Sequence, residues 1–211
     1  MRNNMSMKNY KKETIDFYNK NIDEYIKKTQ GLQDSAWLKK FVKLLPKKAK
    51  ILDLGCGYGR DTQTFVDLGF DCYGVDLSEK MIERAKSRVK KAKFFVMDIL
   101  DLDFADKFFD GIWCNATIVH ISKKDIDQAF NQIYKILKHN GFFHFNLKEG
   151  TGEKFEADER YKGIKKFYSY YSENEIKDLL KKHGFEIIES WHKEPKGYDN
   201  AHMFYFIVKK I

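Results

Sequence analysis

Between residues 49 and 147 the chain alternates short apolar runs with stretches that have the spacing of amphipathic helices. Short apolar runs bounded by glycine or acidic residues are typical of strands buried on both faces, and helices between such strands predict a parallel sheet. The expected strands are AKILDLG, CYGVDL, KFFVMD, FFDGIWCN and GFFHFNL. Two later runs, FEIIESW and AHMFYFIV, are joined by a loop too short for a crossover helix, so they should pair antiparallel. We therefore expect an α/β fold with a doubly wound, mostly parallel seven-stranded sheet and a C-terminal antiparallel hairpin.

The segments outside this alternation predict helices near the N-terminus and an insertion before the last helix. Apolar residues at helical spacing indicate one amphipathic helix over residues 8–28, and a second helix should stop at Pro46. Residues 148–171 are polar and aromatic with no clean period. With two prolines, 13 glycines and no linker-like stretch, we expect a single domain over residues 1–211. In it, residues 1–46 would form a helical cover and the insertion a lid.

Three helix starts carry capping signals. Ser78 is placed to cap the helix that follows the second strand. Ser122 with Asp125, and Ser172 with Glu175, have the spacing of capping boxes.

The net charge of +8 does not by itself indicate a nucleic-acid-binding protein. Of the 39 basic residues 34 are lysine, whereas forked contacts to bases and phosphates favour arginine. Lysine pairs recur along the whole chain, which leaves open how they cluster in space. The chain starts without an apolar leader and has no stretch of roughly 18 apolar residues, so we expect a cytoplasmic protein with no membrane partner. The three cysteines lack metal-ligand spacing, so we expect buried thiols and no metal site.

The segment ILDLGCGYGRD places three glycines at alternate positions directly after the first expected strand. A dinucleotide-binding turn, G-x-G-x-x-G, would need its third glycine where Arg60 or Thr62 stands, and the Gly-Lys-Ser/Thr end of a P-loop is also missing. The turn therefore predicts a close approach of backbone to a ligand without the usual phosphate-binding residues.

Polar residues end four of the expected strands, namely Asp53, Asp76, Asp98 and Asn115. In a doubly wound sheet the carboxyl ends of the strands share one rim, where ligands bind. Asp76 is placed to accept two hydrogen bonds from a ribose diol, although an aspartate there also fits a helix cap. Asp98 taken alone fits a cap or turn better. Together with the glycine turn, the four residues favour a nucleoside site.

The pattern D-x-G-x-G-x-G, followed by an acidic residue at the end of the next strand, resembles the class I S-adenosylmethionine-dependent methyltransferases of the small-molecule type (methyltransferase-domain 11/25-like). ILDLGCGYGRD is similar to their first motif, YGVDLSEKMIERAK to their ribose-binding segment and FFVMDIL to their adenine-side segment. FFDGIWCNATIVHI, a helix and LKHNGFFHFNL resemble their fourth strand through their fifth, and FYNKNIDEYIKKT resembles an N-terminal helix over the cofactor. The resemblance covers residues 49–147. It implies a Rossmann-like fold, S-adenosyl-L-methionine as cofactor and S-adenosyl-L-homocysteine as product.

The resemblance also implies roles on the methionine side of the cofactor. The three alternate glycines would line the methionine portion, Asp53 would help to hold the turn and the ammonium group, and Asn115 would lie beneath this portion. Arg60 would either face the cofactor carboxylate or be a solvated or salt-bridged residue of the first helical turn.

On the nucleoside side, Asp76 would bind the ribose hydroxyls, with Leu77 and Met81 in the same ribose-binding segment. Asp98, with the backbone of Ile99, would recognise adenine. The full set of implied cofactor-binding residues is Tyr25, Asp53, Gly55, Gly57, Gly59, Arg60, Asp76, Leu77, Met81, Asp98, Ile99 and Asn115.

Candidates for the acceptor side come from three segments. His120, after the fourth strand, would act as a base, orient an acceptor or simply pack at a helix entry. Tyr18 and Tyr25 would cover the sulfonium with their rings, or belong to the buried stripe of their helix. The insertion would form part of a lid or acceptor pocket, or pack over the sheet, and its Arg160 would bind an acidic acceptor. The other residues noted there are Asn146, Lys148, Glu149, Tyr161, Phe167, Tyr168, Tyr170 and Tyr171.

The implied activity is an in-line transfer of the sulfonium methyl group to a small-molecule acceptor, with His120 and Tyr18 as candidate catalytic residues. NATI after the fourth strand differs from the NPPY-like motif of base- and amide-modifying N-methyltransferases. Two alternatives are a tRNA or other RNA methyltransferase, encouraged by the pI of 9.1, and a cofactor-binding protein without catalysis. The sequence indicates neither the acceptor atom nor the oligomeric state.

Overall fold

The five expected parallel strands form the centre of the molecule. The computed structural model describes residues 10–31, 35–158, 161, 163–194 and 202–211. The strands are β1 (Lys50–Leu54), β2 (Asp71–Asp76), β3 (Lys93–Val96), β4 (Phe109–Cys114) and β5 (Leu137–Glu149). They lie in the order β3-β2-β1-β4-β5, with parallel pairing throughout. The chain winds one way from β1 to β3 and the other way from β4 to β5, so the carboxyl ends of β1 and β4 flank the switch point where ligands bind in such sheets.

The expected C-terminal hairpin is confirmed. It consists of β8 (Phe185–Lys193) and β9 (Met203–Lys210), which pair antiparallel. The second of these strands also pairs antiparallel with β5, from Phe142 to Lys148, and so joins the hairpin to the parallel strands.

The insertion folds as two further strands, which is a correction to the expected seven-stranded sheet. β6 (Glu153–Asp158) and β7 (Ile164–Tyr171) form an antiparallel hairpin, and β7 pairs in parallel with the last two residues of β5. Within the described residues the sheet therefore has nine strands. From its third residue onward β7 is buried on both faces, so its side chains do not alternate between polar and apolar. This explains why the segment shows no period.

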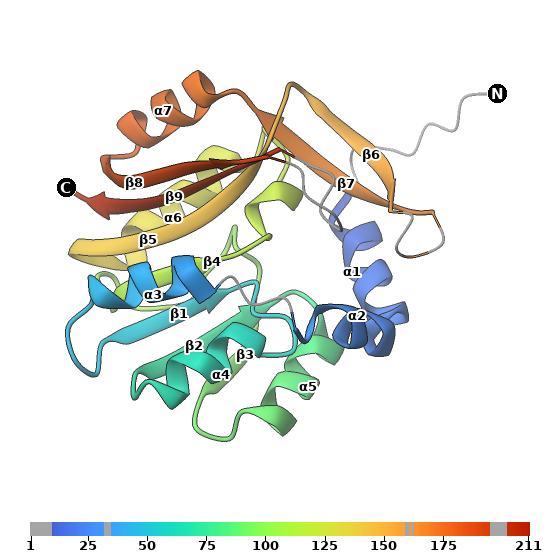
Figure 1. Ribbon diagram of the computed structural model, residues 1–211, viewed down its shortest axis with the longest axis horizontal. Coiled ribbons are helices and arrows are strands. Elements are labelled where there is room, and N and C mark those ends of the chain that lie inside the picture. The colour runs from blue at the N-terminus through green and yellow to red at the C-terminus, as the bar shows by residue number, and fades with distance from the viewer. Residues whose placement is uncertain (1–9, 32–34, 159–160, 162, 195–201) are drawn as a thin grey trace.

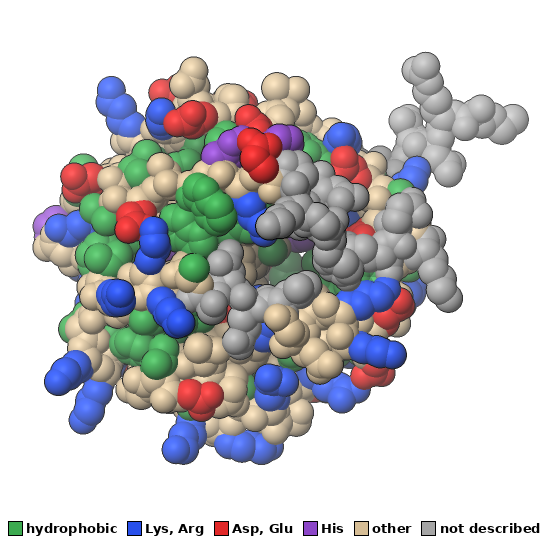
Figure 2. Space-filling model, viewed as in Figure 1, with side chains coloured by type: hydrophobic (Ala, Val, Ile, Leu, Met, Phe, Trp, Pro, Cys, Tyr) green, Lys and Arg blue, Asp and Glu red, His purple; other side chains and the backbone are tan. Residues whose placement is uncertain are grey.

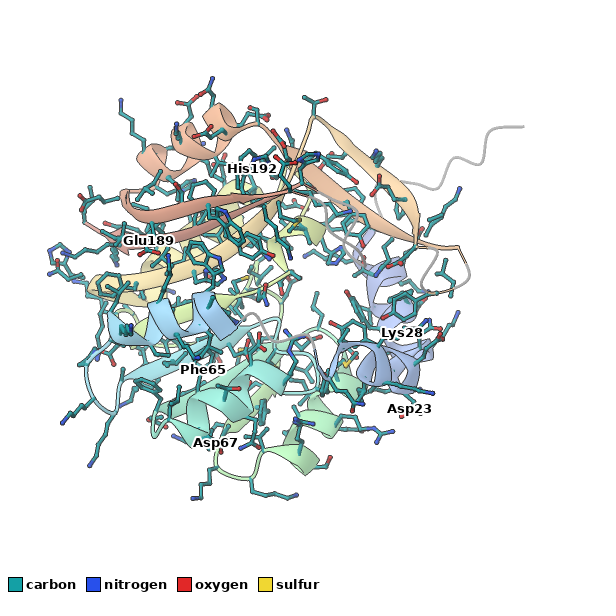
Figure 3. The ribbon with its side chains drawn as sticks, viewed as in Figure 1. Asp23, Lys28, Phe65, Asp67, Glu189 and His192 are labelled. Carbon is teal, nitrogen blue, oxygen red and sulfur yellow. The ribbon has the colours of Figure 1, made fainter. Side chains whose placement is uncertain are left out.

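Helices cover both faces of the sheet (Figure 1). α3 (Ser35–Lys43), α4 (Arg60–Asp67) and α5 (Glu79–Arg88) lie on one face, while α6 (Ile126–Ile136) and α7 (Glu173–Lys182) lie on the other. On the first face Phe41, Phe65 and Trp113 pack in one core, and Phe65 fills the space between α4 and the sheet (Figure 3). On the second face Phe130 of α6 packs against Phe143 of β5.

The N-terminal segment forms two helices, α1 (Tyr10–Lys20) and α2 (Ile22–Thr29), where one helix over residues 8–28 was expected. The break falls at Asn21, whose side-chain amide donates to the carbonyl of Phe17 at 2.8 Å. This local bond competes with the helix. Figure 1 shows both helices at the carboxyl edge of the parallel strands, where α1 contacts β7 and α5.

Two of the three capping signals are confirmed. The hydroxyl of Ser78 accepts from the amide of Met81, and Ser172 with Glu175 forms a complete capping box. The Ser122 capping box was wrong. Asp125 occupies the N-cap of α6, and Ser122 accepts the Asp125 amide through its backbone carbonyl instead.

The fifth strand also begins four residues before the expected Gly141, directly after α6.

On the face shown in Figure 2, Lys and Arg side chains are spread around the surface and do not gather in one patch. Among the described residues, no helix combines the length and the apolarity that crossing a membrane requires.

Candidate active site

The glycine turn connects β1 to α4 with a left-handed backbone at all three glycines. Gly55 has φ of 77°, and a Cβ there would lie 2.0 Å from Oγ1 of Thr117, so the turn is packed directly against the loop after β4. Gly57 has φ of 52°, and a Cβ there would meet nothing within 4 Å, because it faces a cavity. Gly59 has φ of 78° and faces Ala85 of α5 and Val89, which caps the end of that helix, away from the cavities described below.

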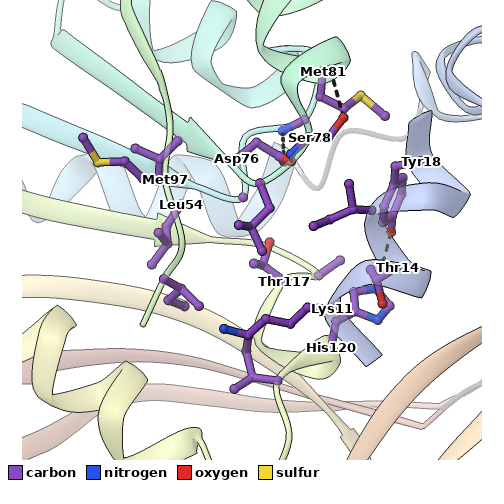
Figure 4. Close-up of a pocket in the computed structure, with 18 of the residues that line it drawn as sticks. Lys11, Thr14, Tyr18, Leu54, Asp76, Ser78, Met81, Met97, Thr117 and His120 are labelled. Carbon is purple, nitrogen blue, oxygen red and sulfur yellow. Dashed lines mark hydrogen bonds between the residues drawn. The ribbon is translucent and has the colours of Figure 1, made fainter. Parts of the chain in front are cut away.

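Asp76 ties this turn to the end of β2. One carboxylate oxygen accepts from the amide of Gly57 at 2.9 Å and the other from the amide of Ser78 at 2.8 Å. Burial raises the pKa of Asp76 above its ordinary value, and these two hydrogen bonds oppose the rise. The carboxylate lines a cavity of about 120 Å³, which we call the nucleoside cavity (Figure 4).

Some of the residues predicted to bind the nucleoside line this cavity, and one does not. Leu77, Met81 and Ile99 line it. Asp98 is not among the lining residues, because one of its oxygens accepts from the amide of Leu100 at 3.0 Å and the other binds Lys11 of α1 at 2.5 Å. The structure thus places Asp98 as a turn and ion-pair residue at the edge of the cavity.

On the methionine side, Asp53 is only 4% exposed and accepts from the hydroxyl of Thr62 at 2.5 Å. Burial, together with the negative charge of Asp61, raises the pKa of Asp53 to about 7.

The pKa of Asp61 shifts in the opposite direction. Burial alone would raise its pKa, but two hydrogen bonds from Arg60 (2.7 and 3.1 Å), with further donors from Trp113 and Asn115, hold the pKa of Asp61 below its usual value. Arg60 is therefore in a salt bridge, one of the two alternatives left open. No sequence motif distinguishes Asp61 as a site residue.

A larger cavity of about 570 Å³, which we call the acceptor chamber, adjoins the nucleoside cavity. The two share lining residues, namely Tyr18, Tyr25, Gly55, Gly57, Asn115, Ala116 and His120. Asp53, Asp61 and Arg60 line the chamber on the cofactor side.

His120 and Tyr18 lie at the junction of the two cavities. The Nδ1 of His120 is 2.7 Å from the carbonyl oxygen of Phe167, so this nitrogen carries the proton and Nε2 carries the lone pair. The hydroxyl of Tyr18 lies 3.4 Å from that Nε2 (Figure 4). Burial raises the pKa of Tyr18 well above its ordinary value, so it remains a neutral donor. The Tyr25 ring meets the Tyr18 ring edge-on, with centroids 5.2 Å apart.

The far wall of the chamber comes from the insertion and the C-terminal hairpin. Of the aromatic residues predicted there, Tyr161 and Tyr168 line the chamber, whereas Phe167, Tyr170 and Tyr171 are buried beside it. Arg160 lies outside the described residues. Sequence reasoning missed Lys166, Trp191, Lys193, Met203 and Tyr205, which also line the chamber and follow no motif.

Of the three residues noted at the end of β5, Asn146 and Lys148 line the chamber. Asn146 accepts from the amide of Ala116 at 2.7 Å and donates to the side chain of Asn115 at 2.9 Å, which orients the latter. Glu149 lies elsewhere, in an exposed cluster with His192 and His202.

Comparison with known proteins places this geometry in a family. The sequence model of a methyltransferase-domain family matches residues 51–141. The carboxy-S-adenosyl-L-methionine synthase of Campylobacter fetus is 30% identical over a match 175 residues long, which covers 70% of this chain and 74% of that protein. The chain belongs to the class I S-adenosylmethionine-dependent methyltransferases.

Two further comparisons show how far the similarity to individual proteins extends. YqeM of Bacillus subtilis is 31% identical over 116 residues, and the match spans 53% of this methyltransferase and only about half (47%) of that relative. Among solved structures, the 1,6-didemethyltoxoflavin-N1-methyltransferase of Burkholderia thailandensis superposes with a TM-score of 0.74 at 23% identity, covering 97% of this chain and 90% of the other. The second likeness shows the fold, and S-adenosylmethionine is the cofactor of the family.

Proposed function

We propose that this methyltransferase transfers the methyl group of S-adenosylmethionine to a small-molecule acceptor. The observation that carries the proposal is the meeting of two cavities at Tyr18, Asn115 and His120. One cavity offers a buried carboxylate for a ribose diol, and the other is large enough for a separate small molecule. The Burkholderia structure with which the fold superposes was solved with 1,6-didemethyltoxoflavin and S-adenosylhomocysteine bound.

The residues present fit the cofactor. Gly57 leaves open space that a Cβ would occupy, and Asp76 presents its carboxylate beside it. In this proposal Asp76 binds the ribose hydroxyls, Leu77 and Ile99 contact the nucleoside, and Asp53 lies toward the ammonium group. The roles of the other implied residues follow from their place. Arg60 holds Asp61 and thereby Asn115, while Gly59 and Asp98 support the turn and the rim.

The cofactor supplies an activated methyl group on a positively charged sulfur. The chain itself orients the acceptor and excludes water, which can account for much of the rate of a displacement. Where the acceptor nucleophile carries a proton, the lone pair on Nε2 of His120 is placed to take it, because the carbonyl of Phe167 holds the proton on Nδ1. The hydroxyl of Tyr18 orients this nitrogen.

The proposal is tested by calorimetry with S-adenosylhomocysteine and by transfer of a radiolabelled methyl group to metabolite and total tRNA pools. Asp76→Ala should abolish binding. Asp71→Ala, at the amino end of the same strand and half exposed, is the matched control and should leave binding unchanged. Tight binding of NADH without binding of S-adenosylhomocysteine would refute the proposal. Binding with no methylated product from any pool would favour a non-catalytic cofactor-binding protein.

The tRNA arm separates the small-molecule proposal from an RNA methyltransferase. α1, α2 and the β6–β7 hairpin supply walls to the two cavities, an enclosure that suits a small acceptor. Transfer to tRNA with a steep loss of activity as salt increases would instead indicate phosphate contacts and an RNA acceptor.

A second candidate function is the synthesis of a carboxylated cofactor. The Campylobacter fetus relative, whose match covers 70% of this chain, is named a carboxy-S-adenosyl-L-methionine synthase. Mass spectrometry of the cofactor after incubation with the protein and a small-molecule extract distinguishes the two. A carboxylated cofactor supports the second function, and S-adenosylhomocysteine with a methylated product supports the first.

A further inference from the structure

Three lysines from three different strands converge on the wall of the acceptor chamber that lies opposite the cofactor side. They are Lys148 at the end of β5, Lys166 in β7 and Lys193 at the end of β8. The carboxylates among the described lining residues, Asp53 and Asp61, are both on the cofactor side, and Asp61 is bound to Arg60. At this wall the charged side chains among the described lining residues are therefore all lysines.

Lys166 is the most informative of the three because it is only 3% exposed. Its ammonium group is 2.7 Å from the carboxylate of Asp158, which is 5% exposed at its side chain and is not among the lining residues. The same ammonium lies 4.4 Å from the ring centroid of Phe17 and 5.0 Å from that of Tyr161. A buried ion pair costs desolvation energy and contributes little to stability, so its presence at a cavity wall points to a role in binding.

Lys148 also pairs with a carboxylate of β6, but this pair is partly exposed, and Glu156 binds Lys154 as well, at 2.8 Å. The ammonium of Lys148 is 3.0 Å from the carboxylate of Glu156, which again lies outside the lining residues, and it is 3.5 Å from the ring centroid of Tyr168. In both pairs the lysine lines the chamber, and its carboxylate partner on β6 is not among the described lining residues. The acidic residues of β6 thus fix the positions of two lysines of the chamber wall.

Aromatic side chains complete this part of the chamber. Tyr168 and Tyr205 line it together with Trp191, and Trp191 packs on Tyr205 with ring centroids 6.0 Å apart. Such rings offer flat apolar surfaces and suit a flat ligand.

We propose that the acceptor is a small planar anion whose carboxylate or phosphate group is bound by Lys148, Lys166 and Lys193. Its flat body lies against Tyr168 and Tyr205, which places the opposite end of the molecule toward His120 and the methyl group. This inference rests on the proposed methyl transfer, because only then is the bound anion the methyl acceptor. The anion site itself is a property of the chamber and is tested by binding alone.

The test measures binding of matched probes by calorimetry, with and without S-adenosylhomocysteine. The probes are 4-hydroxybenzoate against 4-hydroxybenzamide, and phenyl phosphate against phenol. We expect each anion to bind at least about tenfold more tightly than its neutral partner, because charge-assisted hydrogen bonds are about twice as strong as neutral ones. Equal binding of anion and neutral partner, or binding of neither anion, would overturn the proposal.

Variants locate the site. Lys166→Gln alone leaves Asp158 buried without its cation and is expected to destabilise the hairpin, so the double variant Lys166→Gln/Asp158→Asn removes both charges. It should reduce the preference for the anion to less than about threefold. Lys165→Gln, one residue earlier and exposed, is the matched control and should keep the full preference. If both variants behave alike, the anion does not bind at Lys166.

The same experiments separate this inference from the proposed function. Failure of S-adenosylhomocysteine to bind the unaltered protein would refute methyl transfer, while the probe pairs would still report on the chamber. Conversely, methyl transfer to neutral acceptors only, with no anion preference, would leave the proposed function standing and refute the anion site.

Discussion

Gly55 and Gly57 share a left-handed backbone but face different surroundings, and this difference predicts different effects of one added methyl group. In Gly55→Ala the new Cβ collides with Thr117, so we expect a loss of roughly 2–4 kcal/mol in the free energy of unfolding. In Gly57→Ala only the backbone penalty of roughly 1–2 kcal/mol applies, but the methyl group enters the cofactor space. Urea unfolding and calorimetry with S-adenosylhomocysteine check both. Gly57→Ala with unchanged cofactor affinity would show that this glycine does not face the cofactor.

His120 offers a second test at the level of one residue. His120→Gln should lower kcat by about 10²-fold for an acceptor that must lose a proton, because the lone pair on Nε2 is removed. Affinity for S-adenosylhomocysteine should change less than about twofold. The exposed His139→Gln is the control and should have the kinetics of the unaltered protein. An unchanged kcat in His120→Gln would leave His120 as a packing residue.

Residues belonging to a local motif could be located from the sequence, whereas those brought together by the fold could not. Asp76 and Gly57 meet because each stands at a fixed offset from the end of a strand. Asp61 was not distinguished, since an acidic residue in a first helical turn is common, and its role depends on Trp113 and Asn115 from another strand. Lys166 lies in a segment without a period, so its burial had no signal in the sequence.

At the level of helices and strands, two N-caps make a matched pair. Ser78 caps α5 and also donates to the side chain of Asn19 in α1 at 2.6 Å, whereas Ser172 caps α7 and lines neither cavity. Ser78→Ala and Ser172→Ala should each lower the free energy of unfolding by about 1 kcal/mol. Only Ser78→Ala should also weaken binding of S-adenosylhomocysteine, because it removes one of the bonds that hold α1 over the nucleoside cavity. Equal cofactor affinity in the two variants would show that the bond to Asn19 does not position α1.

The sequence predicted the parallel strands and the C-terminal hairpin because their apolar runs are short and bounded by turn residues. It did not predict β6 and β7. The first two residues of β7 are exposed and the next six are buried, a pattern imposed by α1 on one side and the loop after β4 on the other. Asn21 likewise divides the first helix through a side-chain bond that hydrophobic spacing does not report.

For the molecule as a whole, Asp53 makes stability depend on pH. Its pKa in the folded protein is about 7, raised from 3.8, so between about pH 4 and 7 the folded state keeps a proton that the unfolded chain has lost. Increasing pH across this window therefore lowers the free energy of unfolding. In Asp53→Asn this contribution is absent, while the amide oxygen can still accept from Thr62.

The stability of Asp53→Asn relative to the unaltered protein should thus increase from about pH 4 to about pH 7 and stay level above. Urea unfolding of both proteins across this range measures the difference. A constant difference would mean that Asp53 is ionised in the folded protein throughout.

Because α1 forms one wall of the nucleoside cavity, it should affect the rate of product release. Lys11, Thr14, Ile15 and Tyr18 all line that cavity, and Lys11 and Tyr10 fasten the helix to the rim through Asp98 and Asp125. A nucleoside enclosed in this way leaves when the helix lifts, so the residence time of the spent cofactor is set by the detachment of α1. We expect product release to limit turnover, visible as a burst of methylated product in the first catalytic cycle, and a linear time course from the start would place the slow step in the chemistry instead.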